Sequence, residues 1–286
     1  MNKILLAAAS VLGMTTTAVA ADLTYSQPPA GSDFYAPGSA VQAHVDLYGG
    51  GIFINGDIGS DYPDSAGVIG GAGRANMPLR DGWNVQADVQ SLAVLINDDG
   101  GDYSTPTEFS GYAHLYKMTP GSHALGIYGG ASWLLGPQVY TAGLEGQMYW
   151  QRFTLYGQAS AAALNFADIS GSAVQVRGQG QWFLNDNTAL LGDVIWTSID
   201  LDESATDLTL IGTVMHRFDG TPIAGFAKVR WDHATGGGYS EDATTVLAGV
   251  RIIADPPGST LRSSLIGVPM NVEPIQFGLL GLGGGF

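Results

Sequence analysis

The segment AVQVRGQGQWFL, residues 173–184, alternates between two kinds of side chain over most of its length. Val174 and Val176 are apolar and stand at even positions, whereas Gln175 and Arg177 are polar and stand at odd positions. Successive side chains of a β-strand point to opposite faces, so a period of two indicates a strand with one apolar and one polar face.

The same alternation recurs along the chain from residue 41 onward, interrupted by turns rich in Gly, Asp, Asn, Ser or Pro. The expected strands are 41–54, 66–76, 82–96, 107–118, 123–134, 138–150, 152–164, 173–184, 187–198, 206–217, 222–233 and 243–254. Bacterial single-chain barrels have an even number of strands. The sequence therefore predicts an all-β fold, a transmembrane antiparallel up-and-down β-barrel of about 12 strands.

The connections between the expected strands fall into two length classes. The short ones are 78–81, 119–122, 151, 185–186 and 219–221. The long and mostly acidic ones are 55–65, 97–106, 165–172, 199–205 and 234–242, and only 135–137 breaks the rule. Outer-membrane barrels place short turns on the periplasmic side and longer loops outside. A soluble β-sandwich shares the short strands but gives no reason for this segregation.

All six tryptophans fall on the apolar parity of their strands and close to strand ends. We expect aromatic girdles formed by Trp83, Trp150 and Trp182 at the short-turn rim and by Trp133, Trp196 and Trp231 at the long-loop rim. Indole rings concentrate at membrane–water interfaces, so this placement favours a lipid-facing surface over a soluble core.

The two ends differ from the expected barrel, 41–254. Residues 1–20 have one Lys, a short apolar run and the sequence Ala18-Val19-Ala20, which is typical of a cleaved signal peptide. Residues 21–40 are expected to be a periplasmic segment. The tail, 255–286, is expected to be periplasmic, to enter the lumen, or to supply two further strands and so make fourteen. Pro269 and Pro274 argue against the strands because proline cannot donate a ladder hydrogen bond.

Composition excludes several classes of function. The chain has no Cys, which excludes disulfides and thiol chemistry, and its formal net charge is −15, which disfavours nucleic-acid binding. No His has a partner at metal-ligand spacing and no Gly-x-Ser-x-Gly motif occurs. We therefore expect no metal, no cofactor and no enzymatic activity, a lipid-acting enzyme being the least favoured interpretation.

Charged residues on the polar parity are the candidate lumen residues. They are Asp46, Asp88, Glu145, Asp193, Arg177, Lys228, Arg230 and Arg251. Closure of the barrel would bring Arg251 close to Asp46. Opposed charges across a lumen can orient and filter ions, or they can form salt bridges that merely fill a narrow barrel, and the sequence supports both interpretations.

In its architecture and export signal, the chain resembles proteobacterial outer-membrane barrels over residues 41–254. In overall plan it also resembles the small twelve-stranded porins of the oligogalacturonate type. The chain has no motif by which functional residues of those porins could be assigned to individual positions of this sequence. The resemblance implies the cell outer membrane, contact with outer-membrane lipid and lipopolysaccharide, and assembly by the barrel-assembly machinery. The expected function is passive diffusion of small polar solutes through a porin-like channel. The alternative is a non-conducting structural or surface-interaction barrel.

Overall fold

Twelve long strands dominate the structure, a computed structural model that describes residues 41–56, 65–97, 103–104, 107–119, 121–134, 138–166, 169–201, 204–237, 239–255 and 259–266. The long strands are β1 (Gln42–Gly56), β2 (Ser65–Pro78), β3 (Trp83–Asn97), β5 (Thr107–Thr119), β6 (His123–Leu134), β7 (Gln138–Tyr149), β8 (Phe153–Phe166), β9 (Ile169–Asn185), β10 (Thr188–Asp200), β11 (Ser204–Arg217), β12 (Ile223–Gly236) and β13 (Tyr239–Ala254). The short elements are η1 (Arg80–Gly82), β4 (Tyr103–Ser104) and α2 (Leu261–Leu265).

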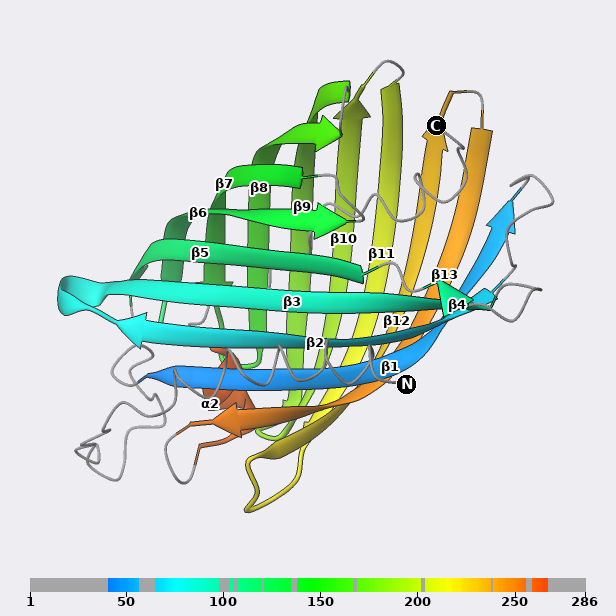
Figure 1. Cartoon of the computed structure of the whole chain (residues 1–286). Coiled ribbons are helices and arrows are strands. Elements are labelled where there is room, and N and C mark those ends of the chain that lie inside the picture. The colour runs from blue at the N-terminus through cyan, green and yellow to red at the C-terminus, as the bar shows by residue number, and fades with distance from the viewer. Residues whose placement is uncertain are drawn as a thin grey trace.

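Each long strand pairs antiparallel with its sequence neighbours, and β1 pairs with β13 to close the barrel (Figure 1). The closing pair runs from Ala43 opposite Ala254 to Gly56 opposite Glu241. β4 is a two-residue addition to the end of β3. Closure removes every unpaired edge, which a sheet inside a bilayer requires. The prediction of a twelve-stranded up-and-down barrel is confirmed.

The tail begins with a helix instead of a strand. Residues 261–265 form α2, and its first turn is capped by Thr260, whose side chain accepts a hydrogen bond from the Ser263 backbone N–H. Figure 1 shows α2 at the end of the barrel where β13 ends. The alternative of fourteen strands is therefore not supported by residues 259–266, and residues 267–286 lie outside the described part of the chain.

Three of the five connections predicted to be long are in fact short hairpins. The ladder continues to Phe166 opposite Ile169, to Asp200 opposite Ser204 and to Gly236 opposite Tyr239. The polar residues of these segments interrupt the apolar alternation and so predict loops. Backbone hydrogen bonds extend a hairpin whether or not its side chains are polar, so the strands reach further than the apolar pattern does.

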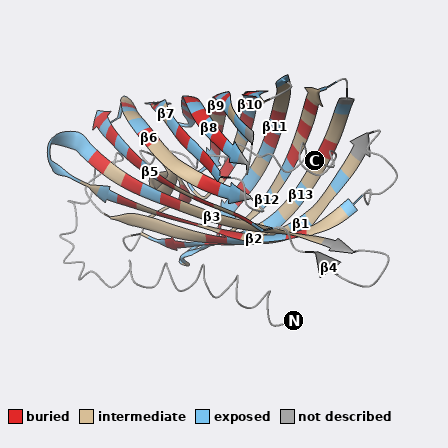
Figure 2. Cartoon of the chain, turned by 45° about the horizontal axis from the view of Figure 1, so that its top comes forward, coloured by how far each residue is buried: buried red, intermediate tan, exposed pale blue. Residues whose placement is uncertain are grey.

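The side chains along each strand alternate between the inside and the outside of the barrel, as the bands of buried and exposed residues show (Figure 2). Apolar side chains cover the outside: Leu144 is 65% exposed, Trp182 56% and Val176 52%. The inside carries buried amides and charges such as Gln86 and Arg177. An apolar outer surface around a polar interior is the reverse of a soluble barrel and suits hydrocarbon. No helix among the described residues is long and apolar enough to span a membrane.

Candidate solute path in the barrel lumen

The candidate lumen residues all lie on inward-facing positions. Asp46, Asp88, Glu145, Asp193, Arg177, Arg230 and Arg251 are buried, and Lys228 is half-buried. Burial of this many ionised groups is costly unless each has a partner of opposite charge or hydrogen bonds. The contacts of each residue therefore decide what the lumen can do.

Closure of the barrel brings Arg251 of β13 opposite Asp46 of β1. The guanidinium donates to the carboxylate in a bidentate pair, with Nε 2.7 Å from Oδ1 and Nη2 2.7 Å from Oδ2. Bidentate pairs of this geometry are among the strongest charge-assisted hydrogen bonds. The pair expected from the sequence therefore exists, and it joins the first strand to the last.

Two further ion pairs lie on β9–β12. Arg177 Nε donates to Asp193 Oδ1 at 2.8 Å, and the Gln179 amide donates to the same oxygen at 2.7 Å. Arg230 Nε donates to Asp232 at 2.7 Å, a carboxylate that also accepts from the Thr209 hydroxyl at 2.6 Å. Every one of these cations is held against an anion on its own or an adjacent strand.

From β2 round to β8, polar side chains form a continuous hydrogen-bonded chain. Arg74 Nε donates to Asp88 Oδ1 at 2.8 Å. The His114 ring lies between two carboxylates, with Nε2 3.1 Å from Asp88 and Nδ1 2.9 Å from Glu145. With one carboxylate at each ring nitrogen, the arrangement suits the protonated imidazolium, because both of its nitrogens carry a hydrogen to donate. The Tyr156 hydroxyl donates to the second Glu145 oxygen at 3.0 Å.

Tyrosine rings fill the space beside this chain on β5–β8. Five of them are buried, namely Tyr112, Tyr116, Tyr128, Tyr149 and Tyr156. His114 stacks on Tyr128 with ring centroids 5.5 Å apart, and Tyr112 lies 6.3 Å from Tyr128. Tyr116 of β5 donates to Asn76 of β2, past the intervening strand β3, at 2.8 Å. We call the part of the wall formed by β5–β8 the filled half.

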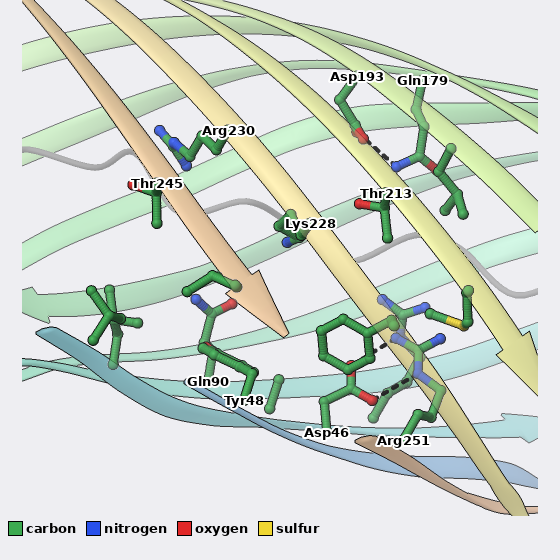
Figure 3. A pocket seen from close by; sticks show the side chains of 18 of the residues that line it. Asp46, Tyr48, Gln90, Gln179, Asp193, Thr213, Lys228, Arg230, Thr245 and Arg251 are labelled. Atoms are coloured by element: carbon green, nitrogen blue, oxygen red, sulfur yellow. Dashed lines mark hydrogen bonds and ion pairs between the residues drawn. The ribbon is translucent and has the colours of Figure 1, made fainter. Parts of the chain in front are cut away.

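A cavity of about 150 Å³ lies along the remaining wall, bordered by β1–β3 and β9–β13. Five cations line it, Arg74, Arg177, Lys228, Arg230 and Arg251, with two carboxylates, Asp46 and Asp193. Figure 3 shows Lys228 and Arg230 next to one another on β12, with Thr213 and Thr245 on the flanking strands. We call this part of the wall the open half, and it is the candidate solute path.

The C-terminal segment, residues 259–266, covers the short-turn end of the lumen. Leu261 is fully buried against Phe183, Met215 and Ile253, while Ile266 also packs against the cluster of Tyr116 and Tyr149 on the opposite wall. Leu265 lines the cavity. The segment is held by the Gln42 amide, which donates to the Ser263 carbonyl at 3.2 Å, and by Arg217, which donates to Ser264 Oγ at 3.4 Å. The cavity therefore has an apolar floor.

Burial raises the pKa of the Asp255 carboxyl, just beyond β13, above its ordinary value. The Ser264 hydrogen bond and the Arg217 and Arg251 charges act in the opposite direction without cancelling it. Asp255 is thus a titratable group in direct contact with the C-terminal segment.

Several lumen residues escaped the sequence analysis. Arg74 lies in a strand in which half of the residues are Gly or Ala, so that alternation is weak, and Asp232 lies close to a strand end. The inward tyrosines share the parity of His114 and Glu145, which is the signal that could have found them. Five of the six expected girdle tryptophans are exposed on the outside: Trp83, Trp133, Trp150, Trp182 and Trp196. Trp231 is half-buried and stacks on His233 with ring centroids 5.8 Å apart.

No family model matches the sequence, and no curated protein matches it. Among solved structures, the chain is similar to the COG4313 outer membrane channel from Pseudomonas putida F1, with 9% identity and a TM-score of 0.54 over 79% of this chain and 100% of that one. The CymD monoaromatic hydrocarbon channel shares 8% identity, with a TM-score of 0.46 over 74% and 88% of the two chains. The KdgM porin in complex with disordered oligogalacturonate shares 9%, with a TM-score of 0.44 over 73% and 98%. The likeness to the first of these structures, at 9% identity, shows the fold alone, which is that of an outer-membrane β-barrel.

Proposed function

We propose that this protein is an outer-membrane channel for the passive diffusion of small polar solutes. One observation carries the proposal: inside a closed barrel with an apolar outer surface lies a cavity bordered by ionised side chains. Charged side chains inside a membrane span usually face water or one another, and they line the paths of polar solutes. A lumen built only for stability could have been filled throughout, as the filled half is.

The charges of the proposed path are balanced by ion pairs. Arg251 with Asp46, Arg177 with Asp193 and Arg230 with Asp232 set cations beside anions along the wall. Such pairs give a local field at the wall and little net charge along the path, so we expect weak selectivity between simple anions and cations. Polar and zwitterionic solutes fit this field best.

The proposed location requires export, assembly and a lipid surround. Residues 1–20 would be the cleaved signal peptide and 21–40 a periplasmic segment, and both ranges lie outside the described residues. The barrel-assembly machinery and lipopolysaccharide are the proposed partners, and the described outer face offers them exposed residues such as Leu125 and Val194. The proposed tail is 255–286, of which 259–266 lies against the lumen end.

A conductance measurement tests the proposal. The purified protein, reconstituted in a planar lipid bilayer, should give discrete current steps in potassium chloride. The reversal potential under a salt gradient should lie near zero if the selectivity is weak. A complete absence of steps, in a preparation shown by circular dichroism to be folded, would contradict the channel.

A non-conducting structural barrel is the second candidate, favoured by the C-terminal segment at the lumen end. The variant Leu261→Asp separates the two, because a carboxylate cannot remain in the apolar cluster that buries Leu261 and the segment should leave the lumen. A channel should then conduct more than the parent protein. If neither protein conducts, the structural role is supported.

A lipid-acting enzyme finds little support in the described residues. Ser122 Oγ lies 2.9 Å from His123 Nδ1 in the exposed turn between β5 and β6. No carboxylate of the described residues hydrogen-bonds this imidazole, so the third member that orients a catalytic histidine is missing there. We do not propose catalysis at this pair.

A further inference from the structure

The inner face of β11–β13 sets a cation beside apolar side chains in the cavity wall. Lys228 stands opposite Thr213 on β11 and Leu247 on β13. Along β12, its inward neighbours are Arg230 on one side and Phe226 on the other. The lysine therefore marks the boundary between a polar and an apolar part of the cavity.

The apolar part has an aromatic surface. Phe226 stands opposite Gly249, and a Cβ at that glycine would lie 2.6 Å from the Phe226 ring, so the missing side chain is what gives the ring its position. Tyr48 of β1 contacts the Phe226 ring edge-on, with centroids 6.5 Å apart. Both rings are half-buried and line the cavity, as does Leu247. These side chains present apolar surface to the space that Lys228 also borders.

A water-filled pore gains nothing from apolar side chains on its inner wall, because polar ones are better solvated. An apolar patch that adjoins a cation is suited to a solute with the same two parts. A cavity of about 150 Å³ matches the size that accommodates a benzene ring, roughly 150 Å³. Aromatic rings bind well edge-on or offset against other rings, which Phe226 and Tyr48 offer.

We propose that the cavity binds small aromatic carboxylates, with the carboxylate at the Lys228 ammonium and the ring against Phe226, Tyr48 and Leu247. The inference names the solute class of the proposed channel and rests on the same lumen. The binding site lies between the outer end of the lumen and Leu265, which borders the cavity at the short-turn end. A solute that enters from outside would therefore bind here before it leaves at the short-turn end. Other channel solutes pass without this site.

Isothermal titration calorimetry of the full chain in detergent, at neutral pH and low salt, tests the site with three probes. Benzoate carries both parts, benzyl alcohol only the ring and acetate only the charge. Benzoate should bind at least about tenfold more tightly than either of the others, the ratio expected for one added charge-assisted contact. Equal affinities for benzoate and acetate, or for benzoate and benzyl alcohol, would overturn the proposal.

Three variants assign the contacts. Lys228→Gln should weaken benzoate about tenfold and leave benzyl alcohol unchanged, and Lys228→Arg should restore most of the affinity. Phe226→Ala should weaken both ring-bearing probes. Lys117→Gln is the matched control, because Lys117 lies on the outer face beside Trp83. An unchanged benzoate affinity in Lys228→Gln would overturn the assignment.

Calorimetry does not require conduction, so the two proposals fail separately. A folded barrel that binds benzoate and never conducts contradicts the channel alone. A conducting barrel that does not distinguish benzoate from acetate contradicts the aromatic carboxylate site alone.

Discussion

The filled half and the open half of the lumen are made of the same kind of inward-facing polar strand, yet the cavity of about 150 Å³ lies along the open half, and a cavity among β5–β8 measures only about 10 Å³. On β5–β8, five buried tyrosines occupy the interior beside the His114 imidazole. On β9–β13 and β1–β3, arginines lie folded along the wall in pairs with Asp46, Asp193 and Asp232. The difference shows that the polarity of a lumen does not decide whether it is open. What differs is the kind of side chain: buried aromatic rings occupy the interior on β5–β8, whereas the arginines of the open half pair with carboxylates of their own or an adjacent strand.

The largest expected effect is on stability, in the filled half. His114→Leu removes the cation between Asp88 and Glu145 and leaves both carboxylates buried. Breaking a buried pair in this way costs about 3–5 kcal/mol of unfolding free energy. Urea unfolding in detergent measures it. Conductance of the folded fraction should stay unchanged, because this half does not carry the path.

His216→Leu is the control for that change, since His216 is exposed and makes a hydrogen bond only to Thr188 among the contacts described. It should cost well under 1 kcal/mol, as surface substitutions usually do, roughly ±0.5 kcal/mol. Equal destabilisation by the two variants would mean that the His114 network does not hold the filled half together.

A lipid-facing arginine should destabilise the barrel by a similar amount on the outer surface of either half. Val176 lies outside the open half and Leu144 outside the filled half, and both are exposed to lipid. Arginine at either position should cost roughly 2–4 kcal/mol, as lipid-facing cations do near the bilayer midplane. Unfolding from lipid vesicles measures both. A large difference between the variants would show that the two halves also differ on the outside.

Charge changes in the open half should alter selectivity. Replacement of Lys228 and Arg230 by glutamine removes two cations that line the cavity and leaves Asp232 without its guanidinium. The reversal potential under a salt gradient should then move toward cation selectivity. Arg74→Gln, which removes a single cavity-lining cation from β2, should move the reversal potential less. An unchanged reversal potential in the double variant would show that these side chains do not line the path.

The smallest expected effect concerns pH. The pKa of Asp255 is raised by burial, so the docked C-terminal segment binds a proton more readily than the free segment does. Docking is therefore favoured at low pH and weakens as the pH rises from the ordinary carboxyl value to the raised one. Hydrogen exchange of the amides of residues 261–266, corrected for the intrinsic pH effect, should report this loosening. Asp255→Asn should remove the pH dependence of this exchange. The same pH profile in that variant as in the parent protein would contradict a role for Asp255.

The sequence predicted the strands and which face each inner residue occupies, because a period of two is imposed by the backbone itself. It also predicted that Arg251 would meet Asp46, since closure places the last strand beside the first. It did not reveal the two halves. Whether a buried ring such as Tyr116 occupies the interior, or a side chain such as Arg177 pairs along the wall, depends on side-chain direction and partners, which parity does not encode. Nor did it reveal α2, because five residues are too few for a helical period to be visible.

Cysteine modification compares the two halves most directly. The chain has no Cys of its own, so a single introduced thiol is the only site of reaction. Cysteine at Thr213 would stand in the open half, and cysteine at Ser160, a buried inward position on β8, would stand in the filled half. Bilayer currents are recorded before and after a charged, water-soluble thiol reagent is added. We expect the reagent to reduce the current through Thr213→Cys and to leave that through Ser160→Cys unchanged. An equal reduction in both, or a reduction only in Ser160→Cys, would contradict a path along the open half.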